Sequence, residues 1–150
     1  MATISCLSVL APAGTSAAQT SPTGDFIAVY TSYGPAGQGL TGHVFVQLHS
    51  ASENVFFGKY PAGSWVFNTD GVIRSDADTR WSWRITYPVQ PSQYQSTLAL
   101  LNDERNNPSR YYLFYDNYAD FAARMVQTAG FSLPSYRNFL NVSEPRVLYE

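Results

Sequence analysis

The sequence predicts an α+β domain in which an antiparallel sheet packs against helices that come late in the chain. Segments with period-2 alternation and many aromatic residues fill the first two thirds of the 150 residues, and helix-period segments appear only in the last third. Hydrophobic residues make up 45% of the chain, enough to bury one core. We therefore expect a single domain over 1–150, in which 1–24 supply a first strand and a loop rich in Ser, Ala, Thr and Gly.

Strands are predicted where apolar and polar residues alternate or where β-branched and aromatic residues gather. These segments are residues 3–10, 26–32, 43–49, 54–60, 64–68 and 80–88. A short polar connection over 50–53 joins two of them into a hairpin. If the hairpin centres on 51–52, Tyr60 lies opposite His43.

Two helices are predicted in the last third of the chain. The first begins at Pro91, carries an apolar stripe through Tyr94, Leu98 and Leu101, and ends before Asn107-Pro108. A strand over 111–115 precedes the second helix, which runs from about 117 to 129 and stops at Gly130.

The start of the second helix is the most informative feature of the sequence. Asn117 with Asp120 three residues later is typical of a capping box, which fixes the first turn. Tyr118 shares a helix face with Phe121 and Met125, so its side chain is expected to point toward the sheet. On residue type alone, Tyr118 is a core tyrosine whose hydroxyl finds a polar partner.

A glycine-rich approach, YGPAGQGLTGHVFVQL, leads to His43 at the first position of a predicted strand. Gly42 beside the histidine allows another segment or a substrate backbone to come close. A histidine at a strand end can act as a general base or orient a nucleophile. The alternative is a structural or surface histidine.

Four stretches, taken together, resemble a known family. They are YGPAGQGLTGHVFVQL, FFGKYPAG, YYLFYDNYADFAARMVQTAGFSLP and SEPRVLYE. The chain from about residue 25 to 150 resembles the circularly permuted branch of the papain-like NlpC-type cysteine peptidases and amidases, found among bacterial wall hydrolases and secreted effectors. The resemblance implies a circularly permuted papain-like fold with the histidine strand first and the nucleophile helix last. It also implies that His43 occupies the position of the catalytic base.

The chain departs from the family at the nucleophile. The family motif is asparagine, cysteine, a small residue, an acidic or polar residue, then phenylalanine, and Tyr118 stands here in the cysteine position. A phenol, with a reference pKa of about 10, lacks the nucleophilicity of a thiolate and is much larger than a cysteine. The resemblance therefore implies an amidase or peptidase scaffold that is catalytically impaired, so that enzyme activity stays open.

His43 and Tyr118 are expected to lie side by side in one cleft, and the remaining site residues are expected around this pair. Tyr60 is the candidate for the residue that orients the histidine, because of its hairpin position. The candidate cleft residues are Tyr30, Ser32, Gly42 and Asn117.

The single cysteine, Cys6, excludes an intrachain disulfide framework and a multi-cysteine zinc site. It lies on the predicted first strand among apolar residues and is interpreted as an inert buried thiol. We expect no cofactor and no metal.

Charge and hydropathy exclude two classes of partner. The formal net charge is −2 and Lys59 is the only lysine, so nothing resembles a nucleic-acid surface. No apolar run approaches the ~18 residues of a membrane span.

The N-terminal segment has no basic residue before its interrupted apolar part, unlike a secretory signal. We expect a bacterial protein made in the cytoplasm and exported, if at all, by a Sec-independent route.

Three functions remain open at this stage. The first is a degenerate papain-like scaffold that binds a peptide-like or peptidoglycan ligand. The second is an active peptidoglycan amidase or endopeptidase whose native residue at position 118 is cysteine. The third is a non-catalytic interaction module, with an immunity or secretion component as protein partner. Related acyltransferases with a histidine strand and an asparagine-cysteine helix are a weaker fourth.

Overall fold

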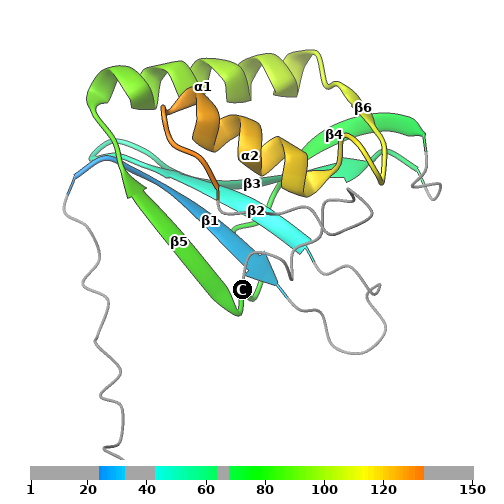
Figure 1. The fold of residues 1–150 in the computed structure, drawn as a ribbon, viewed down its shortest axis with the longest axis horizontal. Helices are drawn as coiled ribbons and strands as arrows, with labels where there is room; N and C mark the ends of the chain where they lie inside the picture. Colours follow the sequence, from blue (N-terminus) through cyan, green and yellow to red (C-terminus); the bar gives the residue numbers. More distant parts are fainter. Residues whose placement is uncertain (1–23, 33–42, 64–67, 134–150) are drawn as a thin grey trace, which may run out of the picture.

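The computed structural model describes residues 24–32, 43–63 and 68–133, which form six strands and two helices (Figure 1). In chain order these are β1 Phe26–Ser32, β2 His43–His49, β3 Asn54–Pro61, β4 Thr69–Ser75, β5 Trp83–Pro88, α1 Pro91–Asn106, β6 Arg110–Tyr111 and α2 Tyr118–Thr128. The strands make one antiparallel sheet in the order β5-β1-β2-β3-β4-β6. The predicted α+β class is thereby confirmed.

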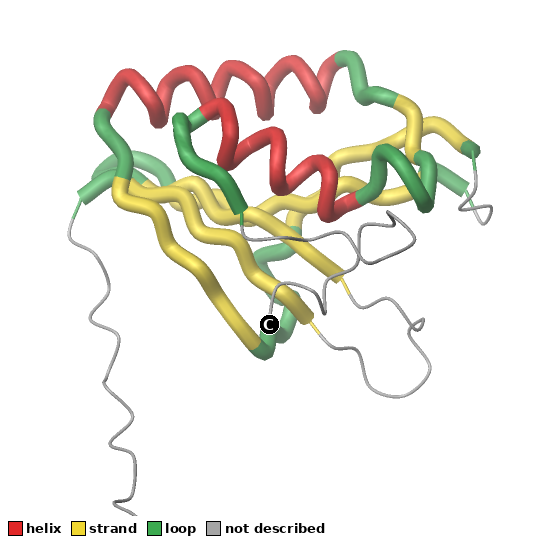
Figure 2. Tube along the Cα trace, in the orientation of Figure 1, coloured by secondary structure: helices red, strands yellow, loops and turns green. Residues whose placement is uncertain are grey.

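Both helices cover the same face of the sheet (Figures 1 and 2). Strand alternation places Val44, Val46 and Leu48 of β2 on that face, where they join Phe121 and Met125 of α2 in the main buried cluster. The alternate residues of β1 and β2 point to the other face and form a smaller cluster of Phe26, Ala28, Tyr30 and Phe45. His43 belongs to this second series, so it lies on the face away from the helices.

The predicted strands and helices are confirmed where the periodicity of apolar residues and the turn or capping residues indicate the same element. The strands at 26–32 and 43–49 are confirmed, and the third strand extends one residue past 60 to Pro61. The hairpin is also confirmed, with His49 paired to Asn54 and Val46 to Phe57. Both helices begin and end within about a residue of the predicted positions.

Strand β4 is missing from the sequence prediction. Asp70 and Gly71 disfavour a strand locally, but β4 is paired with β3 on one side and with β6 on the other, and this pairing overrides the local propensity. The strand predicted at 111–115 is present only as β6, Arg110–Tyr111. Its remainder forms a tight turn that the isolated bridge between Tyr112 and Asp116 closes.

Three other strand predictions differ from the structure or lie outside it. The strand predicted at 80–88 begins only at Trp83. The segment 3–10 lies outside the described residues, as does the segment predicted at 64–68 apart from residue 68, which is not in a strand. No described helix is both long and apolar enough to cross a membrane.

The first turn of α2 is held by the predicted capping box. The Asn117 side-chain oxygen accepts from the Ala119 amide at 2.8 Å and from the Asp120 amide at 3.4 Å. The Asp120 carboxylate in turn accepts from the Asn117 amide at 3.2 Å. The Asn117 side-chain amide also donates to the Leu113 carbonyl at 2.6 Å, which ties the helix start to the preceding turn. Position 118 therefore has a fixed backbone.

We expect Asn117→Ala to lower the free energy of unfolding by about 1–2 kcal/mol, because two helix amides lose their acceptor. Urea denaturation measures the loss. Asn107→Ala, at the exposed C-terminal end of α1, is the matched control and should change stability by no more than about 0.5 kcal/mol. Equal effects of the two substitutions would contradict a special role for the cap.

Candidate functional site

His43, Tyr60 and Asp76 meet on the face of the sheet away from the helices. His43 opens β2, Tyr60 lies near the end of β3 and Asp76 follows β4. The imidazole Nε2 of His43 is 3.2 Å from each carboxylate oxygen of Asp76 and 2.8 Å from the Tyr60 hydroxyl. The same hydroxyl donates to Asp76 Oδ1 at 2.5 Å. The side chain of Asp76 is 1% exposed and that of His43 is 18% exposed, so the carboxylate is buried while the imidazole reaches the surface.

The carboxylate of Asp76 is held in its ionised form. Burial alone would raise the pKa of Asp76, but the hydrogen bond and charge of His43, with hydrogen bonds from Tyr60 and Thr79, keep that pKa below its ordinary value. Thr79 donates to Asp76 Oδ1 at 2.8 Å from the turn that follows β4. Three donors thus surround one buried carboxylate.

The hydrogen bonds also select a tautomer of His43. Burial, together with the bond to Asp76, raises the pKa of Tyr60, so its side chain is a neutral phenol that donates to the carboxylate. The phenol oxygen and the carboxylate are then both acceptors for Nε2 of His43. This arrangement fits a proton on Nε2 in both charge states of the ring, and in the neutral imidazole the lone pair is then on Nδ1.

Gly58 provides the space in which the cluster packs against β3. A Cβ atom at this position would lie 3.0 Å from both Cε1 and Nε2 of His43 and would overlap the Asp76 carboxylate. Neither ring nor carboxylate can move away without breaking a hydrogen bond. A glycine in the middle of this strand is therefore required by the site.

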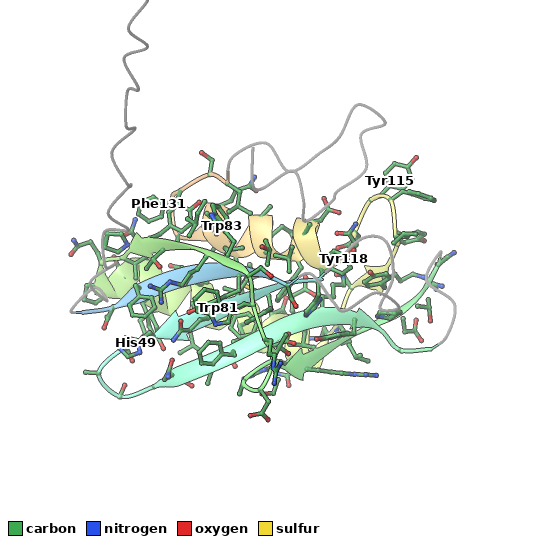
Figure 3. All side chains as sticks on the ribbon, turned by 90° about the horizontal axis from the view of Figure 1, so that it is seen from below. His49, Trp81, Trp83, Tyr115, Tyr118 and Phe131 are labelled. Atoms are coloured by element: carbon green, nitrogen blue, oxygen red, sulfur yellow. The ribbon has the colours of Figure 1, made fainter. Side chains whose placement is uncertain are left out.

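Tyr118, the first residue of α2, contacts His43 edge to face. The two ring centroids are 5.6 Å apart at 79°, and Tyr118 is 7% exposed. Figure 3 shows Tyr118 at the end of α2 that is nearest the turn carrying Tyr115. The prediction that His43 and Tyr118 lie side by side is confirmed. The paired residues of β2 and β3 end at Val46 and Phe57. His43 lies beyond this last pair, at the start of β2.

The other predicted site residues take different places. Asn117 is fully buried as the helix cap, and Ser32 pairs with His43 in the β1–β2 ladder. Tyr30 stacks on Phe45 at 5.0 Å, and Phe45 stacks on His43 at 5.8 Å. Gly42 and Cys6 lie outside the described residues. Tyr60 contacts His43 as the hairpin register predicts, and its role in orienting the ring stays a prediction.

Sequence reasoning missed Asp76 and Thr79. Both lie after a strand that was itself not predicted, in the stretch SDADT, where Asp76 and Asp78 look alike. The Thr79 amide donates to the Asp76 carbonyl at 3.0 Å, which closes a turn. Aspartate and threonine both favour turns, so these residues were the signal that the sequence offered. Only the β3–β4 pairing distinguishes the buried Asp76 from the exposed Asp78.

Among the described residues, no group of three or more His, Cys, Asp and Glu side chains could hold a metal ion. No protein-family model matches the chain, and no curated protein or solved structure matches it. An imidazole paired with a buried carboxylate can act as a general base, provided that a group to deprotonate lies near Nδ1.

We expect Gly58→Ala to destabilise the protein by about 1–3 kcal/mol, because the methyl group has to displace Asp76 or His43. Gly63→Ala is the matched control, since a Cβ atom there has only Thr69 Oγ1 nearby, at 3.9 Å. Urea denaturation of both variants makes the comparison. A neutral or stabilising Gly58→Ala would show that the cluster is not packed as described.

Acid should weaken the fold through Asp76. Because its folded pKa lies below the unfolded value of about 4, its contribution is fully present above pH ~4 and is lost as pH falls further. Asp76→Asn should therefore flatten the decrease in unfolding free energy below pH ~4. Asp78→Asn, at an exposed position two residues away, is the control. Identical acid slopes for wild type and Asp76→Asn would contradict the assignment.

Proposed function

We propose that the chain is an NlpC-type, circularly permuted papain-like amidase or peptidase scaffold of a bacterial secreted or wall-acting protein, with hydrolysis disabled at Tyr118. One observation carries this proposal. His43, backed by the buried carboxylate of Asp76, is in ring contact with the first residue of helix α2. A base, an orienting carboxylate and a helix N-terminus thus converge from three separate elements.

The geometry suits a thiol at position 118. Such a thiol would sit in the first turn of α2, where the helix dipole and free amides stabilise a thiolate. His43 would remove its proton, and the thiolate would attack an amide carbonyl and release the amine, leaving a thioester for water to hydrolyse. The phenol of Tyr118 supplies neither a thiolate nor the space for a scissile bond.

Asp76 takes the orienting role that the sequence suggested for Tyr60. Its carboxylate accepts from Nε2 of His43, and such a bond fixes both the tautomer and the plane of the imidazole. Tyr60 bridges the two groups and so supports both. The order of the chain, with the histidine strand before the helix of position 118, agrees with the permuted arrangement that the sequence resembles.

The burial of Tyr118 favours a disabled scaffold over an active amidase with a native cysteine. The ring packs between His43 and Tyr111 and belongs to the main buried cluster. A site shaped around a small thiol would have no need of a packed phenol ring. The proposed ligand remains peptide-like or a peptidoglycan fragment, recognised without cleavage, and a protein partner is the alternative.

The unmodified chain is expected not to hydrolyse peptidoglycan fragments, whereas Tyr118→Cys is expected to gain measurable turnover. The reason is that the introduced thiol meets a helix terminus and a paired base that are already in place. Turnover is measured by chromatography of the released fragments. Removal of the base in Tyr118→Cys/His43→Ala should lower this turnover by about 10²-fold or more.

Two controls separate the interpretations. Alkylation by iodoacetamide measures thiol activation without any substrate, and the wild-type chain gives the background from Cys6. Turnover by the unmodified chain that depends on His43 would contradict the disabled scaffold. A Tyr118→Cys protein whose alkylation is unaffected by His43→Ala would contradict the papain-like arrangement itself.

A further inference from the structure

Lys59 is a buried cation directly behind the candidate site. It is the only lysine of the chain, and its side chain is 0% exposed. Its ammonium donates to Ser109 Oγ at 2.7 Å, to the Arg110 carbonyl at 3.0 Å and to Asp116 Oδ1 at 2.8 Å. An ammonium group has three N–H donors, so each of them is used.

The lysine belongs to a charge network that joins three parts of the fold. Asp116 Oδ1 also accepts from Arg124 Nη1 of α2 at 2.8 Å, and Arg124 Nη2 donates to Glu104 Oε1 of α1 at 3.1 Å. Two positive and two negative side chains therefore balance. Burying such groups is expensive, and apolar side chains of similar volume often stabilise a fold as well or better. The network is thus better explained by the geometry that it imposes than by stability.

Asp116 transmits this geometry to position 118. Its backbone is tied to Tyr112 in both directions, with the Tyr112 amide donating to the Asp116 carbonyl at 3.1 Å and the Asp116 amide donating back at 3.0 Å. The next residue is the helix cap Asn117, and the residue after that is Tyr118. A displacement of the Asp116 carboxylate would move the first turn of α2.

The strand that carries Lys59 also carries the partner of the base. Tyr60 is the next residue of β3 and points to the opposite face, where its hydroxyl bonds His43 and Asp76. Adjacent residues of one strand thus hold the helix start on one side of the sheet and the imidazole on the other.

The path of the lysine side chain is built into the neighbouring strand. Gly71 of β4 faces Lys59, and a Cβ atom there would lie 2.9 Å from Lys59 Cε and would overlap the Ser109 carbonyl oxygen. Burial lowers the pKa of Lys59, while the bond and charge of Asp116 act against this shift. Burial would raise the pKa of Asp116, but Lys59 and Arg124 hold it below its ordinary value.

We propose that Lys59 is a positioning residue, which sets the placement of residue 118 against His43 by anchoring Asp116 to β3. This proposal rests on the proposed function for its catalytic meaning. The placement of residue 118 by Lys59 does not depend on whether the site hydrolyses a substrate.

The first test uses the full chain with its native tyrosine. In Lys59→Met, the nuclear Overhauser effect between the His43 ring proton Hε1 and the Tyr118 ring protons should be lost, because the anchor of Asp116 is gone. The chain has two histidines, so His49→Gln assigns the signals. Leu101→Ala, in the buried face of α1, is the control for destabilisation alone and should keep the effect. An unchanged effect in a folded Lys59→Met protein would overturn the proposal.

The second test measures thiol activation in the Tyr118→Cys background. Adding Lys59→Met should lower the rate of alkylation by iodoacetamide below pH 7, by about tenfold for each unit by which the thiol pKa rises. Leu101→Ala in the same background should leave the pH profile in place. Asp116→Asn removes the same anchor from the other side, so it replaces Lys59→Met if that variant does not fold.

The outcomes distinguish this proposal from the proposed function. If the introduced thiol is never activated but Lys59→Met still separates the two rings, the papain-like chemistry is wrong and the positioning role stands. If the thiol is activated and neither Lys59→Met nor Asp116→Asn changes its pH profile or the ring contact, the positioning role is wrong and the papain-like site stands.

Discussion

Three consecutive residues of β3 constrain both faces of the sheet at one point. Gly58 leaves room for the imidazole and the carboxylate, Lys59 binds the segment before α2, and Tyr60 joins His43 to Asp76. Strand alternation sends Lys59 to the helix side and Tyr60 to the opposite side. A one-residue slip of β3 would exchange these faces, placing a phenol under the helices and an ammonium against the imidazole. The site therefore depends on the register of the β2–β3–β4 ladders.

The charged groups of the described core are few and are held by specific partners. Charged residues make up only 13% of the chain, yet Lys59, Asp76 and Glu104 are all buried. Both Asp76 and Asp116 keep a lowered pKa despite burial, because hydrogen bonds to the ionised form outweigh desolvation. Electrostatics in this fold fixes where elements meet, and the apolar clusters supply the burial that drives folding.

The sequence predicts those parts of the site whose positions are set locally. The hairpin places Tyr60 across from His43, and the capping box with the helix period turns Tyr118 toward the sheet. These features depend on residues within a few positions of one another, so pattern and turn chemistry are enough to find them. The contact between His43 and Tyr118 joins distant segments, and its prediction combined two local patterns, the inward face of the helix and the glycine-rich approach to His43, with the resemblance to a family arrangement.

Asp76 could not be predicted in the same way. It directly follows β4, whose strand character comes from pairing on two edges and not from its own residues. The partners of Lys59 were missed for a related reason, because Ser109 and Asp116 lie 50 and 57 positions away along the chain. Long-range pairing decides which of several similar polar residues is buried, and a single sequence carries no signal of that choice.

The His43–Asp76–Tyr60 cluster can remain intact even where no nucleophile is present. Each member satisfies the hydrogen bonds of the other two in a largely buried setting, so truncating one leaves an unsatisfied polar group that costs about 1–3 kcal/mol. Tyr118 adds a ring contact to His43 of this cluster, and its own side chain is buried. Under the proposed function, such a site is structurally required and chemically silent at the same time, because the groups that would orient a base also complete the packing of the sheet.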